Sequence, residues 1–128
     1  VIGLMATDGT IQTGIYGRKA KSMKLAMVVP DKEHQTMVME AIYGEKGVKA
    51  GYTDGYCKEV LLKAAEHLVK DKGAQALILG CTELPLILEE TDNLKLGDGH
   101  AAIVDPTSSL ARRVVKVAGE ITKIRGVR

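Results

Sequence analysis

The stretch AQALILGCTELPLIL, residues 74–88, is the clearest indication of the fold class. Its first part, residues 74–79, is short and apolar, which is typical of a strand buried in a sheet. The segment GCTE, residues 80–83, follows at once, and the apolar pattern then resumes as a predicted short helix containing Pro85. A buried strand that ends in small polar residues before a helix is the repeating unit of an α/β domain.

Three further apolar stretches predict strands, which with residues 74–79 make a four-stranded sheet. They are residues 1–5, 24–29 and 101–104. Turn residues or helix-capping residues follow each of them. Helices are predicted from Ile11 with Thr10 as cap, from Lys32 with Asp31 as cap, from Thr53 or Asp54, and from Pro106 with Asp105 as cap. This alternation indicates an α/β domain, expected as a three-layer α/β/α arrangement around a mostly parallel sheet.

The composition argues against several classes of partner. The 128 residues suit one domain, with 45% hydrophobic and 27% charged residues. A net charge of +2, four Tyr and no Phe or Trp indicate neither nucleic-acid binding nor attraction to an anionic membrane. No apolar run approaches the roughly 20 residues that span a bilayer. Two cysteines without a CxxC spacing predict neither a disulfide framework nor a zinc site, so the expected compartment is cytoplasmic.

Two polar strand tails predict a binding site. In parallel sheets, ligands bind outside the carboxyl ends of the strands. The tails of the first and third predicted strands, ATDGT at 6–10 and GCTE at 80–83, are both small and polar, and both would lie at that edge. Thr7, Gly9 and Thr10 offer hydroxyls and backbone amides, which bind carboxylate or phosphate readily at a strand-to-helix junction. Alternatively, these three residues form only a capping turn.

Cys81 allows a functional and a structural interpretation. It follows a buried strand and precedes a predicted helix, whose N-terminal N–H groups would lower the pKa of the thiol. The resulting thiolate is a competent base or nucleophile near neutral pH. Alternatively, Cys81 fills space in the core, as cysteines often do, although the adjoining Thr82 and Glu83 favour function. Cys57 lies on the apolar stripe of a predicted helix and is expected in the core.

The remaining candidates are weaker. Lys49, in the Gly-rich loop 44–52, could reach an anion or could simply be solvated. His34, His67 and His100 show no metal-ligand spacing, so no metal site is predicted. We expect His34 and His67 at the surface of their helices, whereas His100 lies in a predicted loop from which it could approach the site.

Four segments carry a family pattern in their order along the chain. They are GLMATDGTIQTGIY (3–16), AIYGEKGVKAG (41–51), LGCTELPLIL (79–88) and VDP (104–106). The first and third resemble the two motifs that mark the second half of the aspartate/glutamate racemases, and the others match segments between and after those motifs. The matches cover nearly the whole chain. The chain therefore resembles the second domain of a pseudosymmetric two-domain racemase.

This resemblance implies cofactor-independent racemisation of a small acidic amino acid, with neither pyridoxal phosphate nor a metal. In the family, two α/β domains each supply one cysteine, on opposite faces of the substrate. One thiolate removes the α-proton and the other thiol returns one from the far side. By resemblance, Cys81 is the catalytic cysteine of the second domain. Thr7, Thr10 and Thr82 would hold the substrate carboxylate, and Lys49 would lie near its side-chain carboxylate.

Gly9 and Glu83 belong to the same motifs and are expected to support the site. The cysteine motif and Gly-rich opening motif of the family's first domain are absent from this sequence. Inversion at carbon needs an acid and a base on opposite faces, and Cys57 is badly placed to be the second. We therefore expect the C-terminal half of a racemase, nearly inactive alone, whose missing N-terminal domain belongs to the same polypeptide. The start of the sequence, directly in an apolar strand, agrees with this expectation.

The expected organisation is a racemase C-terminal domain at 1–104 and a C-terminal helix at 105–128. In the family this helix packs back on the first domain, so its apolar face would here favour helix swapping or a homodimer. Two other functions stay open. One is a single-cysteine decarboxylase or isomerase that protonates an enolate from one face. The other is a non-catalytic module that binds carboxylates or dimerises. The choice between aspartate and glutamate is also open.

Overall fold

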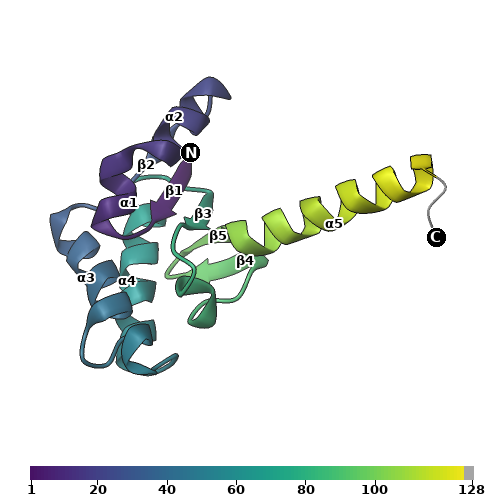
Figure 1. Ribbon diagram of the computed structural model, residues 1–128. Coiled ribbons are helices and arrows are strands. Elements are labelled where there is room, and N and C mark those ends of the chain that lie inside the picture. Colours follow the sequence, from purple (N-terminus) through teal and green to yellow (C-terminus); the bar gives the residue numbers. More distant parts are fainter. Residues whose placement is uncertain (126–128) are drawn as a thin grey trace.

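One sheet organises the domain (Figure 1). The computed structural model describes residues 1–125, without the side chains of Thr122, Ile124 and Arg125. Its five strands, in the order β2-β1-β3-β5-β4, are β1 (Ile2–Met5), β2 (Met27–Val28), β3 (Ala76–Leu79), β4 (Thr91–Leu96) and β5 (Gly99–Val104). The pairs β2–β1, β1–β3 and β3–β5 are parallel, and β4 pairs with β5 in the antiparallel sense. The predicted α/β class with a mostly parallel sheet is confirmed.

The helices follow the strands in the predicted alternation. They are α1 (Asp8–Thr13), α2 (Ile15–Ser22), α3 (Lys32–Tyr43), α4 (Tyr56–Lys70) and α5 (Pro106–Arg125), with the short 3₁₀ turns η1 (Val48–Ala50) and η2 (Leu84–Leu86). Asp31 caps α3 by accepting the His34 N–H, and the Asp105 carboxylate accepts the Thr107 N–H at the start of α5. Both caps were predicted. None of the helices in residues 1–125 is long and apolar enough to cross a membrane.

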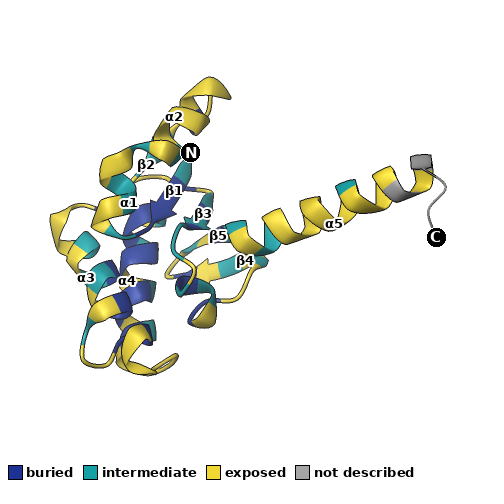
Figure 2. Ribbon diagram, in the orientation of Figure 1, coloured by how far each residue is buried: buried dark blue, intermediate teal, exposed yellow. Residues whose placement is uncertain are grey.

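The core lies between one face of the sheet and α4, with α3 packed beside α4. Leu77 and Leu79 of β3 and Ala101 and Ile103 of β5 point into this core and are buried. Their neighbours on the opposite face of the two strands are only half-buried. The predicted stripe of α4 from Cys57 to Leu68 is buried as well (Figure 2).

Helix α5 projects away from the sheet and is exposed along most of its described length (Figures 1 and 2). Leu110 and Val115 expose 65% and 72% of their surface, and Val114 and Ile121 are exposed too. The predicted helix begins where expected, and residues 126–128 of the segment 105–128 lie outside the described residues. An apolar helix face is therefore uncovered in this structure.

The predicted strand count was wrong by one. Strand β4, residues 91–96, was missed because it reads TDNLKL, and only Leu96 in it is buried. An antiparallel edge strand needs only one apolar face, so it carries no continuous hydrophobic run. Gly97 and Asp98 form the turn of the β4–β5 hairpin, with Gly97 at φ 59°.

Several element boundaries also differ from the prediction. Thr7, not Thr10, caps the first helix, because the Thr7 side chain accepts the Thr10 N–H. The strand predicted at 24–29 pairs only at Met27–Val28, and the short helix predicted after residue 83 is the 3₁₀ turn η2.

Candidate functional site

The carboxyl ends of β1 and β3 lie side by side. Met5 pairs in register with Leu79, and the Gly80 N–H donates to the Met5 carbonyl at 2.7 Å. A Cβ on Gly80 would lie 2.7 Å from Leu4 Cδ1 and 3.0 Å from Ala6 Cβ, so only glycine permits this approach. The two polar tails therefore leave the sheet as neighbours at one edge.

Three of the predicted site residues meet around the carboxylate of a fourth, Glu83. The Cys81 thiol donates to Glu83 Oε2 at 2.8 Å, and the Thr82 hydroxyl donates to the same oxygen at 2.9 Å. Lys49 Nζ lies 2.7 Å from Glu83 Oε1. A thiol, a hydroxyl and an ammonium group thus converge on the two oxygens of Glu83.

The short turn η1 holds Lys49 in this position. Its neighbour Val48 is buried in the core, and Gly51 ends the turn with φ at 95°, a conformation that favours glycine. The ammonium group also lies 5.4 Å from the centre of the Tyr43 ring. The core residue and the glycine direct the lysine of an otherwise polar loop toward Glu83.

The electrostatics of this cluster reverse one prediction. Burial, followed by the hydrogen bond to the Glu83 side chain, raises the pKa of the Cys81 thiol above its ordinary value, against the smaller opposing effects of the Glu83 backbone N–H and of Lys49. The predicted lowering was wrong for this structure, because burial and the carboxylate that faces the sulfur outweigh the backbone N–H. This environment therefore favours the thiol form of Cys81 over the thiolate.

The surroundings of Glu83 favour its ionised form. Hydrogen bonds from Cys81, Lys49 and Thr82 lower the pKa of its carboxyl to about 2. Glu83 in turn raises the pKa of Lys49, first by the hydrogen bond and then by charge. The sequence pattern placed Glu83 in a supporting position but gave no sign that it bridges the other three.

The tail of β1 forms the second part of the site. Thr7 Oγ1 accepts the Thr10 N–H at 3.3 Å, and the two hydroxyls are 3.1 Å apart. Gly9 has open space, since a Cβ there would meet only Thr7 Oγ1 at 4.0 Å. Gln35, which sequence reasoning missed, donates to the Ala6 carbonyl at 2.9 Å and ties α3 to this tail. A lone polar residue in a helix carries no signal that would have identified it.

The other cysteine and two of the histidines lie away from this cluster. Cys57 is buried in the core as predicted, and its thiol donates to the Asp54 carbonyl at 3.3 Å. His67 was predicted at the surface, which is wrong: it is only 6% exposed, because its nitrogens meet polar groups between α3 and α4. His100 pairs with Lys95 at the amino end of β5, the edge opposite the site, so it does not approach Cys81.

Comparison with known sequences gives a consistent match. Residues 1–114 match the family described as Asp/Glu/Hydantoin racemase. An uncharacterized protein in the pnlA 3′ region of Pectobacterium carotovorum subsp. carotovorum is 32% identical over 117 residues, covering 90% of this chain and 71% of that protein. The glutamate racemase of Limosilactobacillus reuteri is 25% identical over 112 residues, covering 88% of this chain and 39% of the enzyme.

Solved structures give the same picture. The chain superposes on an aspartate racemase homologue from Pyrococcus horikoshii OT3 with a TM-score of 0.72 and 26% identity, covering 92% of this chain and 48% of that one. The Picrophilus torridus aspartate racemase gives a TM-score of 0.61 and 28% identity, with 92% and 45% covered. The chain thus spans about half the length of these structures.

Proposed function

Since this chain belongs to the Asp/Glu/hydantoin racemase family, we propose that it supplies one half of an active site that racemises a small acidic amino acid. In this proposal Cys81 serves one face of the α-carbon, and a complementary domain serves the other. The proposal is supported by the names of the relatives, glutamate racemase and aspartate racemase, and by the share of their length that the chain spans.

The observation that carries the proposal is the convergence of Cys81, Thr82 and Lys49 on the carboxylate of Glu83. The same donors can hold a carboxylate that arrives from solution, because charge-assisted hydrogen bonds are the strong ones in such a site. In this proposal an acidic ligand binds beside the thiol, near Glu83.

Substrate binding divides between the two strand tails. We assign the α-carboxylate of the substrate to Thr82 together with Thr7 and Thr10, whose hydroxyls and amides lie on the neighbouring tail. We assign the side-chain carboxylate of the substrate to Lys49. Gly9 supports the site by leaving the backbone of the first turn of α1 open to an anion.

The proton transfers follow from the state of the thiol. A base on the far face takes the α-proton, and the electron pair of that C–H bond moves into the carboxylate to give an enediolate. The S–H bond of Cys81 then breaks as its proton passes to the α-carbon from the near face, which inverts the centre and leaves a thiolate. In the reverse direction that thiolate takes the α-proton. The raised pKa of Cys81 suits its role as the acid.

Helix α5 is the proposed docking element for the complementary domain. We divide the chain into the α/β domain, 1–104, and the helical segment that starts at residue 105. Leu110, Val114 and Val115 leave an apolar face uncovered, and covering such a face stabilises an interface. A homodimer and a cytoplasmic location, which suits the two free cysteines, are part of the proposal.

Racemisation assays test the half-site. The chain alone and the chain fused behind the first domain of a family racemase would be compared on L-aspartate and L-glutamate by circular dichroism. The proposal expects racemisation only from the fusion. Robust racemisation by the 128-residue chain alone would refute the half-site.

A single-cysteine decarboxylase or isomerase is the second candidate, and the protonated state of Cys81 favours it. One neutral thiol beside a carboxylate site is sufficient to protonate an enolate from one face. This reading expects the chain to convert a substituted malonate into one enantiomer of the product. If the fusion does neither reaction and binds aspartate with equal affinity after Cys81→Ala, the chain is a carboxylate-binding module.

A further inference from the structure

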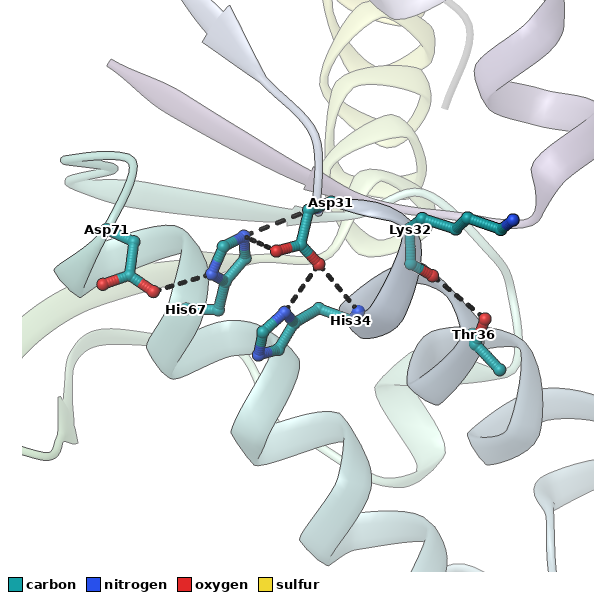
Figure 3. A network of polar contacts seen from close by, with 6 residues as sticks. All are labelled: Asp31, Lys32, His34, Thr36, His67 and Asp71. Carbon is teal, nitrogen blue, oxygen red and sulfur yellow. Dashed lines mark hydrogen bonds and ion pairs between the residues drawn. The ribbon is translucent and has the colours of Figure 1, made fainter.

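Two histidines and two aspartates meet where α3 begins and α4 ends (Figure 3). Asp31 is the N-cap of α3 and His34 lies in the first turn of that helix, whereas His67 is in the last turn of α4 and Asp71 caps it. Asp31 and His67 are 36 residues apart in the chain. No sequence spacing could therefore reveal this cluster, which shares no residue with the site around Cys81.

The ligand atoms of three of these residues lie within reach of one ion. One atom each from Asp31, His34 and His67 lies within 4.8 Å of the others. His34 Nδ1 is 2.7 Å from Asp31 Oδ1, and His67 Nε2 is 3.6 Å from Asp31 Oδ2. The two imidazole rings stack with centroids 3.9 Å apart and planes 5° from parallel.

Hydrogen bonds to both ring nitrogens hold the buried His67 in one orientation. Its Nδ1 lies 2.8 Å from Asp71 Oδ2, a carboxylate that can only accept, so Nδ1 carries the proton. Its Nε2 accepts the Asp31 backbone N–H at 3.4 Å, which requires a lone pair on that nitrogen. A histidine whose far nitrogen donates to a carboxylate is the usual arrangement behind a metal ligand, because it fixes the tautomer and raises the basicity of the near nitrogen.

A hollow lies on the histidine side of this cluster. It measures about 260 Å³ and is lined by His34, His67, Glu66 and Asp71, whereas Asp31 lies outside its lining. Lys63 and Lys70 also line it, and Lys63 is bound to Glu59 at 2.8 Å. The His34 side chain is about a quarter exposed, so it can turn out of the stack to direct a nitrogen at an ion.

We propose that Asp31, His34 and His67 bind a divalent transition-metal ion, with Asp71 orienting His67 and water completing the coordination. Two imidazole nitrogens and one carboxylate oxygen match the ligands of Zn²⁺. The ion links the start of α3 to the end of α4. It acts as a clip between the two helices that cover the core and takes no part in the reaction at Cys81.

Zinc titration of the full chain tests this. The chelator-treated protein would be titrated with ZnCl₂ in a calorimeter, with Co²⁺ absorption as a second readout. The proposal expects one ion per chain, at least a ten-fold loss of affinity in His34→Ala and in Asp31→Asn, and a rise in the melting temperature on zinc binding that His34→Ala abolishes.

Two matched variants separate this site from other zinc ligands. His100→Ala removes an exposed histidine elsewhere, and Cys81→Ser removes the thiol of the other site; both should leave the affinity unchanged. Zinc binding that persists in His34→Ala and Asp31→Asn, or that Cys81→Ser removes, overturns the proposal, as does the absence of binding.

Because His34→Ala and Asp31→Asn alter the start of α3, the fold of these two variants would be checked by circular dichroism. Histidine ¹⁵N spectra of the unmodified chain give a result that does not depend on whether any variant folds. Zinc must shift Nε2 of His67 and leave His100 unchanged, and no shift at His67 contradicts the proposal.

Discussion

The Cys81 thiol donates a 2.8 Å hydrogen bond to Oε2 of Glu83, two residues further along the chain. Lys49 binds the other oxygen of the same carboxylate at 2.7 Å. Burial and then this carboxylate raise the pKa of the thiol, while the thiol and the lysine lower the pKa of the carboxyl. The protonation states of Cys81 and Glu83 are linked through this one contact.

Removing the charge of Glu83 should make Cys81 more acidic. Glu83→Gln keeps the side-chain size but removes the negative charge and frees Lys49 to act on the sulfur, so the pKa of Cys81 falls. The rate of iodoacetamide alkylation against pH measures this in a Cys57→Ala background, which leaves one thiol. We expect alkylation at pH 8 to speed up several-fold, because the thiolate fraction rises as the pKa falls.

Glu89→Gln is the matched control, since Glu89 is an exposed carboxylate and the Cys81 thiol donates to Glu83 instead. An unchanged or slower reaction in Glu83→Gln would mean that Glu83 does not govern the thiol.

Loss of Lys49 should raise the pKa of Glu83. In Lys49→Met the carboxyl keeps its bonds to Cys81 and Thr82 but loses the ammonium group, so its pKa moves up from about 2 toward the ordinary 4.5. Carboxyl ¹³C shifts followed against pH measure this directly. Lys46→Met, in the same loop, should leave the Glu83 titration where it is in the unmodified chain.

The Lys49–Glu83 pair should also contribute to the pH dependence of the unfolding free energy. Because the folded-state pKa of Glu83 is depressed, its contribution to stability is present above pH 4.5 and is lost as the pH falls toward 2. Urea unfolding across this window should show a shallower pH dependence in Lys49→Met than in the unmodified chain. Identical slopes would show that the pair does not couple to folding.

Gly80→Ala should separate the two strand tails. The new Cβ would lie 2.7 Å from the buried Leu4 side chain and 3.0 Å from Ala6, so overpacking costs about 1–3 kcal/mol of unfolding free energy. Gly119→Ala is the counterpart, since a Cβ there meets nothing within 4 Å in α5 and should stabilise that helix by about 0.5–1 kcal/mol. Urea denaturation distinguishes them; equal effects would contradict the close approach at Gly80.

Charges on α5 should impair association and leave folding intact. Leu110→Glu and Val115→Glu change exposed positions, so we expect unfolding free energies within about 0.5 kcal/mol of the unmodified chain. Sedimentation velocity should show weaker self-association, or weaker binding to an added first domain. A large loss of stability instead would indicate that α5 packs on its own domain.

The sequence predicts correctly those elements that depend on residues close together in the chain. Buried strands such as 76–79 and helix caps such as Asp31 and Asp105 depend on a few neighbouring residues, and the structure confirms them. Strand β4 was not predicted because its own residues are mostly polar and it forms by pairing with β5 across a turn.

The features that were missed depend on contacts between distant segments. The Asp31 N–H, at the start of α3, contacts the buried His67 of α4. Gln35 of α3 donates a hydrogen bond to the tail of β1. The pKa of Cys81 is raised and not lowered because burial and the hydrogen bond to the Glu83 side chain outweigh the backbone N–H of Glu83 and the charge of Lys49. Sequence order indicates which residues reach the edge of a sheet but not how their side chains pair.

Proton transfer by Cys81 is the central claim, and solvent deuterium uptake at the α-carbon tests it most directly. The chain fused behind a family first domain would be incubated with L-aspartate or L-glutamate in D₂O and followed by ¹H NMR. We predict loss of the α-proton signal with racemisation in the fusion and in its Cys57→Ala variant, and, with the product enantiomer followed by circular dichroism, racemisation at least about 100-fold slower in Cys81→Ala. Racemisation that proceeds equally fast in Cys81→Ala would contradict the account.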